Sequence, residues 1–70
     1  MTRFLIVIER AQRNYSAYAP DLPGCVATGR TPEAVKRRMD TAIAMHVAGL
    51  QEDGLPVPEP TTQADYVTLS

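Results

Sequence analysis

The first hydrophobic run of the sequence, residues 3–9, is apolar at almost every position. Side chains alternate between the two faces of a strand, so Phe4, Ile6 and Ile8 share one face, and the apolar residues between them share the other. This pattern is typical of a strand that is covered on both sides. We therefore expect these three side chains to lie in the core or against a second chain.

Two further short runs have strand character. Residues 15–19 resume the pattern after a polar interruption, which predicts a hairpin with the first run. Residues 25–29 form a third short run that ends in glycine. The hairpin and the third strand together should occupy residues 3–30.

The connection between the second and third runs, residues 18–25, is rich in turn-forming residues. Pro20 cannot donate a hydrogen bond to a sheet and should end the second strand. Asp21 can cap a turn through its side chain, Pro23 fixes one backbone angle, and Gly24 supplies a positive φ if the turn is type II. Leu22, between the two prolines, should either tuck under the sheet or meet a partner.

A helix is predicted over residues 32–53. Thr31 can cap its first turn, and Pro32 is tolerated at the first helical position. Gly54 can provide the left-handed stop, with Leu55 folding back on Leu50. One face is apolar apart from a histidine: Val35, Met39, Ala42, Ile43, His46, Gly49 and Leu50.

The expected architecture is a single α+β domain, β-β-β-α-β over residues 1–70, with one helix on a small, mostly antiparallel sheet. Residues 55–63 contain three prolines and form an extended connector, and residues 65–69 have the composition of a last strand, at an edge or exchanged. A helix of 22 residues is about 33 Å long, whereas such strands span roughly 17–23 Å, so the helix should overhang the sheet. The uncovered sheet face predicts a second copy of the chain, as a homodimer or homotetramer.

Charge divides the 70-residue chain more sharply than its net value of −1 suggests. Residues 1–38 hold all seven Lys and Arg against three acids, a net charge of +4, and residues 39–70 hold five acids and no base, a net charge of −5. Such asymmetry concerns partners rather than fold. One cysteine and the absence of an apolar run long enough for a membrane span favour a cytoplasmic protein.

The residue types that perform catalysis are sparse. His46 falls in the apolar helix face, which indicates a core or interface histidine, and Cys25 at the start of a strand is expected to be a packing residue. Glu9, Asp40 and Asp65 are the candidate ligands of a metal-dependent nuclease, but their expected positions do not converge. We expect no catalytic residues, metal or cofactor.

The order of segments carries more information than any single residue. "YSAYAPDLPGCVATGRTPEAV" followed by "AIAMHVAGLQEDGLPVPEP" resembles the HicB-like antitoxin family over about Tyr15 to Pro60. The resemblance implies a partial, catalytically degenerate RNase H-like fold that forms oligomers. It also implies that the chain neutralises a small, basic HicA-type toxin that cleaves mRNA, by masking the surface and active site of the toxin. Many members add a C-terminal DNA-binding segment; with a chain that ends at Ser70, DNA binding is not expected.

The acidic half is the natural complement of a toxin that grips RNA. The expected toxin contacts are Asp40, Glu52, Asp53, Glu59, Asp65 and Leu22. Two alternatives stay open: a minimal RNase H-like metal-dependent nuclease, and a nucleic-acid-binding homo-oligomer that uses the basic half.

Overall fold

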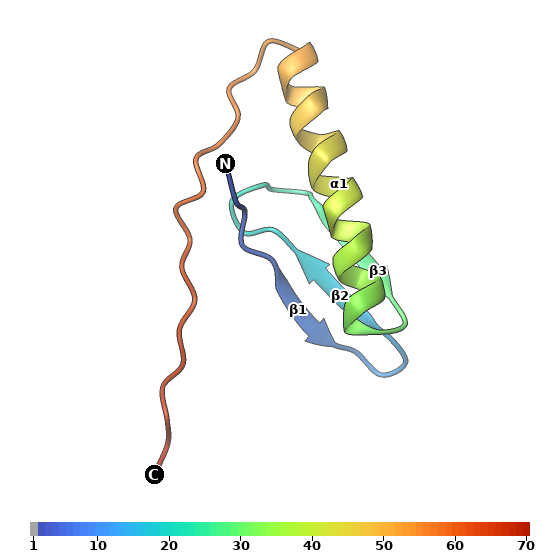
Figure 1. Cartoon of the computed structure of the whole chain (residues 1–70), viewed down its shortest axis with the longest axis vertical. Helices are drawn as coiled ribbons and strands as arrows, with labels where there is room; N and C mark the ends of the chain where they lie inside the picture. The colour runs from blue at the N-terminus through green and yellow to red at the C-terminus, as the bar shows by residue number, and fades with distance from the viewer. Residues whose placement is uncertain (1) are drawn as a thin grey trace.

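The computed structural model describes residues 2–70, which contain three strands and one helix in the order predicted (Figure 1). The strands are β1 (Val7–Arg10), β2 (Tyr15–Tyr18) and β3 (Val26–Gly29), and the helix is α1 (Pro32–Glu52). The sheet is antiparallel throughout, in the order β1-β2-β3. The α+β class is therefore confirmed.

One face of the sheet is covered by α1, and the other is open to solvent. On one face, Ala17 pairs with Ile8 on β1 and with Ala27 on β3, and α1 packs over this row from the side of β2 and β3. On the other face, Val7, Tyr18 and Val26 form a continuous cross-strand row. Neighbours of this kind interact directly across a sheet. The outer row is thus apolar and remains open to solvent in the single chain.

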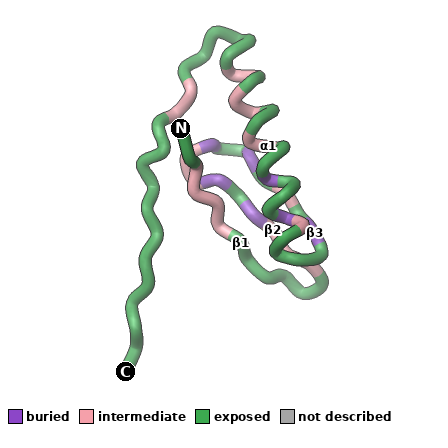
Figure 2. The backbone as a smooth tube through the Cα atoms, in the orientation of Figure 1, coloured by how far each residue is buried: buried purple, intermediate pink, exposed green. Residues whose placement is uncertain are grey.

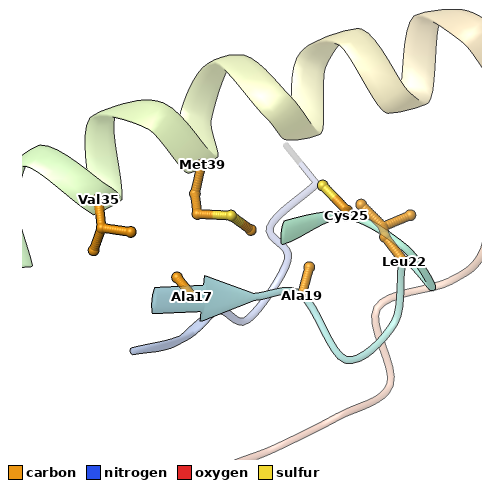
Figure 3. Close-up of a cluster of buried hydrophobic side chains, with 6 residues drawn as sticks. All are labelled: Ala17, Ala19, Leu22, Cys25, Val35 and Met39. Carbon is orange, nitrogen blue, oxygen red and sulfur yellow. The ribbon is translucent and has the colours of Figure 1, made fainter. Parts of the chain in front are cut away.

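The core lies between β2, β3, the 18–25 connection and the first half of α1 (Figure 3). Its buried members are Ala17, Ala19, Leu22, Cys25, Val35 and Met39. Phe4 and Ile6 pack against this cluster and are half-buried, as expected. Ile8 keeps 38% of its surface exposed, because α1 packs on β2 and β3 rather than over β1.

Both ends of α1 form as the sequence predicts. The Thr31 hydroxyl accepts a hydrogen bond from the Ala34 amide at 3.0 Å, and Pro32 occupies the first turn. Gly54 has a φ of 69°, and the Leu55 amide donates to the Leu50 carbonyl at 2.9 Å. The first bond satisfies an amide of the first turn, and the second satisfies a carbonyl that the last turn would otherwise leave free.

The 18–25 connection contains two consecutive turns. The Leu22 amide donates to the Ala19 carbonyl and the Cys25 amide to the Leu22 carbonyl, each at 3.0 Å. Gly24 has a φ of 83°, as a type II turn requires at that position. Leu22 has no exposed surface, so its assignment as a toxin contact is wrong: the turns direct its side chain into the core.

The structure departs from the predicted strand boundaries at both ends of the chain. β1 begins at Val7 rather than at residue 3, because β2 ends at Tyr18 and the chain then turns at Pro20, which leaves residues 3–6 beyond the ladder. Residues 65–69 form no strand in the single chain and are exposed throughout (Figure 2). The predicted overhang of the helix is visible: both of its fully buried residues, Val35 and Met39, lie in its first half.

Candidate protein-binding surface

Two of the five predicted acidic contacts lie side by side at the overhanging end of the helix. Glu52 is the last residue of α1 and Asp53 is its C-cap, and both are exposed. Asp40 lies twelve residues earlier, about 18 Å along the axis. There it forms an ion pair with Lys36, with Nζ and Oδ2 3.7 Å apart. Glu52 and Asp53, which are adjacent in the sequence, therefore lie well away from Asp40.

The carboxylates of Glu52 and Asp53 oppose the helix dipole. The C-terminal end of a helix carries a partial negative charge, which favours cations nearby and disfavours anions. The last turn of α1 holds no basic residue to compensate. These two charges weaken their own helix and are free to interact with a cationic group of another molecule.

Apolar side chains accompany this acidic end. Met45 lies seven residues before Glu52, so both point to the same side of α1, and Met45 and Leu55 are exposed. We call Met45, Glu52, Asp53 and Leu55 the helix-end surface. It combines negative charge with exposed apolar area, and so offers a cationic partner both complementary charge and apolar contact.

His46 and Leu50 lie next to the helix-end surface, on the neighbouring side of the helix, and are half-buried. Glu59 and Asp65 follow on the extended segment after the helix and are exposed. The acidic half of the sequence thus continues from the helix end along this segment (Figure 1).

Basic residues gather at the opposite end of the helix. Arg13, Arg30 and Arg38 line a groove of about 550 Å³ between the β1–β2 turn and the start of α1. Arg38 Nη1 donates to the Thr28 carbonyl at 3.0 Å, which fixes one wall of the groove. Three of the seven basic residues therefore lie at the end of the helix opposite Glu52 and Asp53.

The residues considered for catalysis are not assembled into a site. Cys25 lies in the core, and burial raises the pKa of its thiol, so the reactive thiolate is disfavoured. Across residues 2–70, no three His, Cys, Asp or Glu side chains are grouped so that they could hold a metal ion. Glu9, Asp40 and Asp65 are accordingly not brought together. The same residues contain no helix that is both long and apolar enough to cross a membrane.

Asp21 has a role that sequence reasoning missed. Instead of capping its own turn, its carboxylate accepts hydrogen bonds from the Thr62 hydroxyl at 2.8 Å, the Thr62 amide at 3.1 Å and the Thr61 hydroxyl at 3.3 Å. These bonds, chiefly that from the Thr62 hydroxyl, lower the pKa of Asp21. The turn thereby holds a segment forty residues later in the chain. Nothing local in the sequence indicates this pairing.

These elements define a small α+β domain in which one helix overhangs a three-stranded antiparallel sheet. The chain belongs to the HicB-like antitoxin family of bacterial toxin–antitoxin systems, whose family model matches residues 4–69. Membership supports an antitoxin role. It also confirms the resemblance seen in the sequence.

Two relatives extend this comparison. A 14.9 kDa protein from the rep-hol intergenic region of Haemophilus phage HP1 is 31% identical over 62 residues, which are 89% of this chain and 47% of the phage protein. A UPF0150 protein of Helicobacter pylori is 37% identical over 49 residues, which are 70% of this chain and 68% of that protein. The chain thus spans about half the length of the phage relative. No solved structure matches the chain.

Proposed function

We propose that this protein neutralises a small, basic toxin of the HicA type, which cleaves mRNA, by covering the surface with which the toxin holds RNA. The observation that carries the proposal is the uncompensated pair Glu52 and Asp53 at the overhanging helix end, beside exposed Met45 and Leu55. A protein that grips RNA presents cations to the phosphates, and those cations match this pair. The apolar neighbours supply area that excludes water around the ion pairs.

The extended segment after the helix lengthens this surface. Glu59 and Asp65 are exposed there and keep the same sign of charge. Acidic residues spread along this segment steer a basic partner during encounter and raise its association rate at low salt. Fast capture suits an antidote, because the toxin is then bound before it reaches RNA.

The antitoxin acts, in this proposal, as a homo-oligomer in the cytoplasm. The supporting observation is the outer row of the sheet, in which Tyr18 and Val26 remain 41% and 65% exposed beside Val7. A contiguous apolar row of this kind is a contact surface rather than an ordinary solvent face. A second copy can cover it.

The test is binding of a purified HicA-type toxin, measured by calorimetry. We expect micromolar or tighter affinity that weakens as salt rises. Changing Glu52→Gln together with Asp53→Asn should weaken binding about tenfold or more, within the range measured for charge pairs at interfaces. The control is Glu33→Gln, which removes one acid from the first turn of the same helix. Absence of binding refutes the proposal, and an equal loss in the control refutes the role of the helix end.

The basic groove supports a second candidate function, nucleic-acid binding. The supporting observation is that Arg13, Arg30 and Arg38 line the same groove. A phosphate-binding groove predicts RNA affinity that falls steeply with salt. Arg13→Gln with Arg30→Gln should then abolish the change in fluorescence anisotropy of a labelled RNA, whereas Arg3→Gln should not. Salt-independent or absent binding rejects this function.

A further inference from the structure

The single chain exposes far more surface than a compact protein of its mass. Its accessible area is 5894 Å², whereas a folded monomer of 7.7 kDa is expected to expose about 4,300 Å². Its radius of gyration is 13.5 Å, against roughly 11 Å for a compact domain of this length. The excess of about 1,600 Å² exceeds the roughly 800 Å² that each partner buries in a standard interface.

Much of this excess comes from the end of the chain. Tyr66, Val67 and Leu69 are 97%, 97% and 96% exposed. They belong to residues 65–69, here called the tail, which have strand composition yet lie in no strand. Scattered apolar residues on a surface need no explanation, but three large ones on one bare extended segment do.

The base of the tail is held in place. The hydrogen bonds from Thr61 and Thr62 to Asp21 fix the chain just before the tail begins. From there the tail continues past the sheet, away from its own domain, in about the same direction as β1 (Figure 1). A segment anchored at its base and bare beyond it is positioned to reach another molecule.

A place for such a segment exists on the same domain. β1 is an edge strand with one side unpaired, and residues 3–6 continue it without a partner in the sheet. A groove of about 710 Å³ lies between residues 3–6 and the segment that contains Pro60, Thr62, Gln63 and Ala64. Exposed edges of this kind accept an added strand. Arg3 lines the groove and Asp65 begins the tail, so their charges are complementary.

We propose that two copies of this chain exchange their tails, each tail pairing as a fourth strand along the free β1 edge of the other copy. The inference rests on the self-association proposed above and specifies how it occurs. The exchange buries Tyr66, Val67 and Leu69 and gives residues 3–6 the ladder partner that the single chain lacks. It is reciprocal, so it closes as a two-fold dimer rather than growing into a filament.

The test uses the full chain, with its molar mass in solution measured by light scattering and the exchange of its tail amides measured by mass spectrometry. We expect a dimer in which alternate amides of residues 66–69, those that face β1 of the other copy, are protected, and loss of that protection on dilution to monomer. Val67→Pro removes a backbone donor and fixes φ away from the strand range, at a position that is 97% exposed in its own chain. It should halve the mass and leave the helical signal unchanged. The matched control, Val67→Thr, keeps the donor and the β-branched shape and should remain dimeric.

Three results overturn the exchange. A full chain that is monomeric at high micromolar concentration refutes both exchange and self-association. A dimer that survives Val67→Pro with unprotected tail amides refutes exchange alone and leaves association through the outer row of the sheet. Tail amides protected equally in a dilute monomer show that the tail folds back on its own chain. Toxin binding is measured separately, so its failure does not bear on this result.

Discussion

Replacing Gly29 by alanine should destabilise the domain through a clash with the helix backbone. A Cβ at this position would lie 2.8 Å from the Val35 amide nitrogen, 3.0 Å from Val35 Cα and 3.2 Å from the Ala34 carbonyl carbon. Backbone atoms of a helix cannot move aside as a flexible side chain does, so α1 must shift away from β3. Overpacking of this kind costs about 1–3 kcal/mol. This is a large share of the free energy of unfolding, which is roughly 4–10 kcal/mol for a chain of this length.

The assay is thermal unfolding followed by circular dichroism at one fixed protein concentration, since association also changes stability. Gly29→Ala should lower Tm by about 5–20 °C. Gly49→Ala is the matched control, because a Cβ there meets nothing within 4 Å and the position lies inside the helix. That substitution should raise stability by about 1 kcal/mol through helix propensity. If Gly29→Ala unfolds at the wild-type temperature, or if both variants shift Tm in the same direction, the reasoning from close approach is refuted.

Three further predictions concern charge and reactivity. Glu52→Gln and Asp53→Asn should each stabilise the helix by about 0.3–1 kcal/mol, because the native charges oppose the helix dipole. The same substitutions should weaken toxin binding. Paired measurements of Tm and affinity check this, and a loss of stability contradicts it. The Cys25 thiol should react with iodoacetamide far more slowly in the native protein than in denaturant, since burial raises its pKa; equal rates would contradict its burial. Asp21→Asn should speed hydrogen exchange at the Thr62 amide at neutral pH, and Asp21→Glu should restore part of the protection; unchanged exchange in Asp21→Asn would show that the carboxylate does not hold the chain.

The features that the sequence predicts correctly are those that depend on neighbouring residues. The caps of α1 need only Thr31 with Pro32 at one end and Gly54 at the other, and each acts within a few residues. The turn at Gly24 is equally local, because a positive φ suits glycine. The family resemblance, which the match over residues 4–69 confirms, rests on the same succession of short signals.

The features that it misses depend on residues that are distant in the chain. β1 is shorter than its apolar run because the neighbouring strand turns away at Pro20, and hydrophobicity alone does not reveal how far a neighbour extends. The sequence leaves open whether Leu22 packs under the sheet or contacts a partner, and only the three-dimensional path of the turns shows that it is buried. The anchoring of Thr61 and Thr62 by Asp21 shows the same division, because it joins residues about forty positions apart and no local pattern marks it.

Asp21 connects the stability of the anchored segment to pH, and the proposed exchange extends that link to the dimer. Docking of Thr61 and Thr62 lowers the pKa of this carboxyl, so the docked state favours the charged form. The stabilisation that the ionised Asp21 carboxylate gives to the docked segment is fully present above the ordinary aspartate range near pH 4. It is lost as the pH falls through the lowered pKa. If the tail must be anchored to reach the other copy, the dissociation constant of the dimer should rise as the pH falls through this range. Asp21→Asn should weaken the dimer at neutral pH and flatten its acid dependence, which sedimentation at several pH values measures. A wild-type dimer whose dissociation constant stays constant through this range would show that the anchor and the exchanged strand act independently.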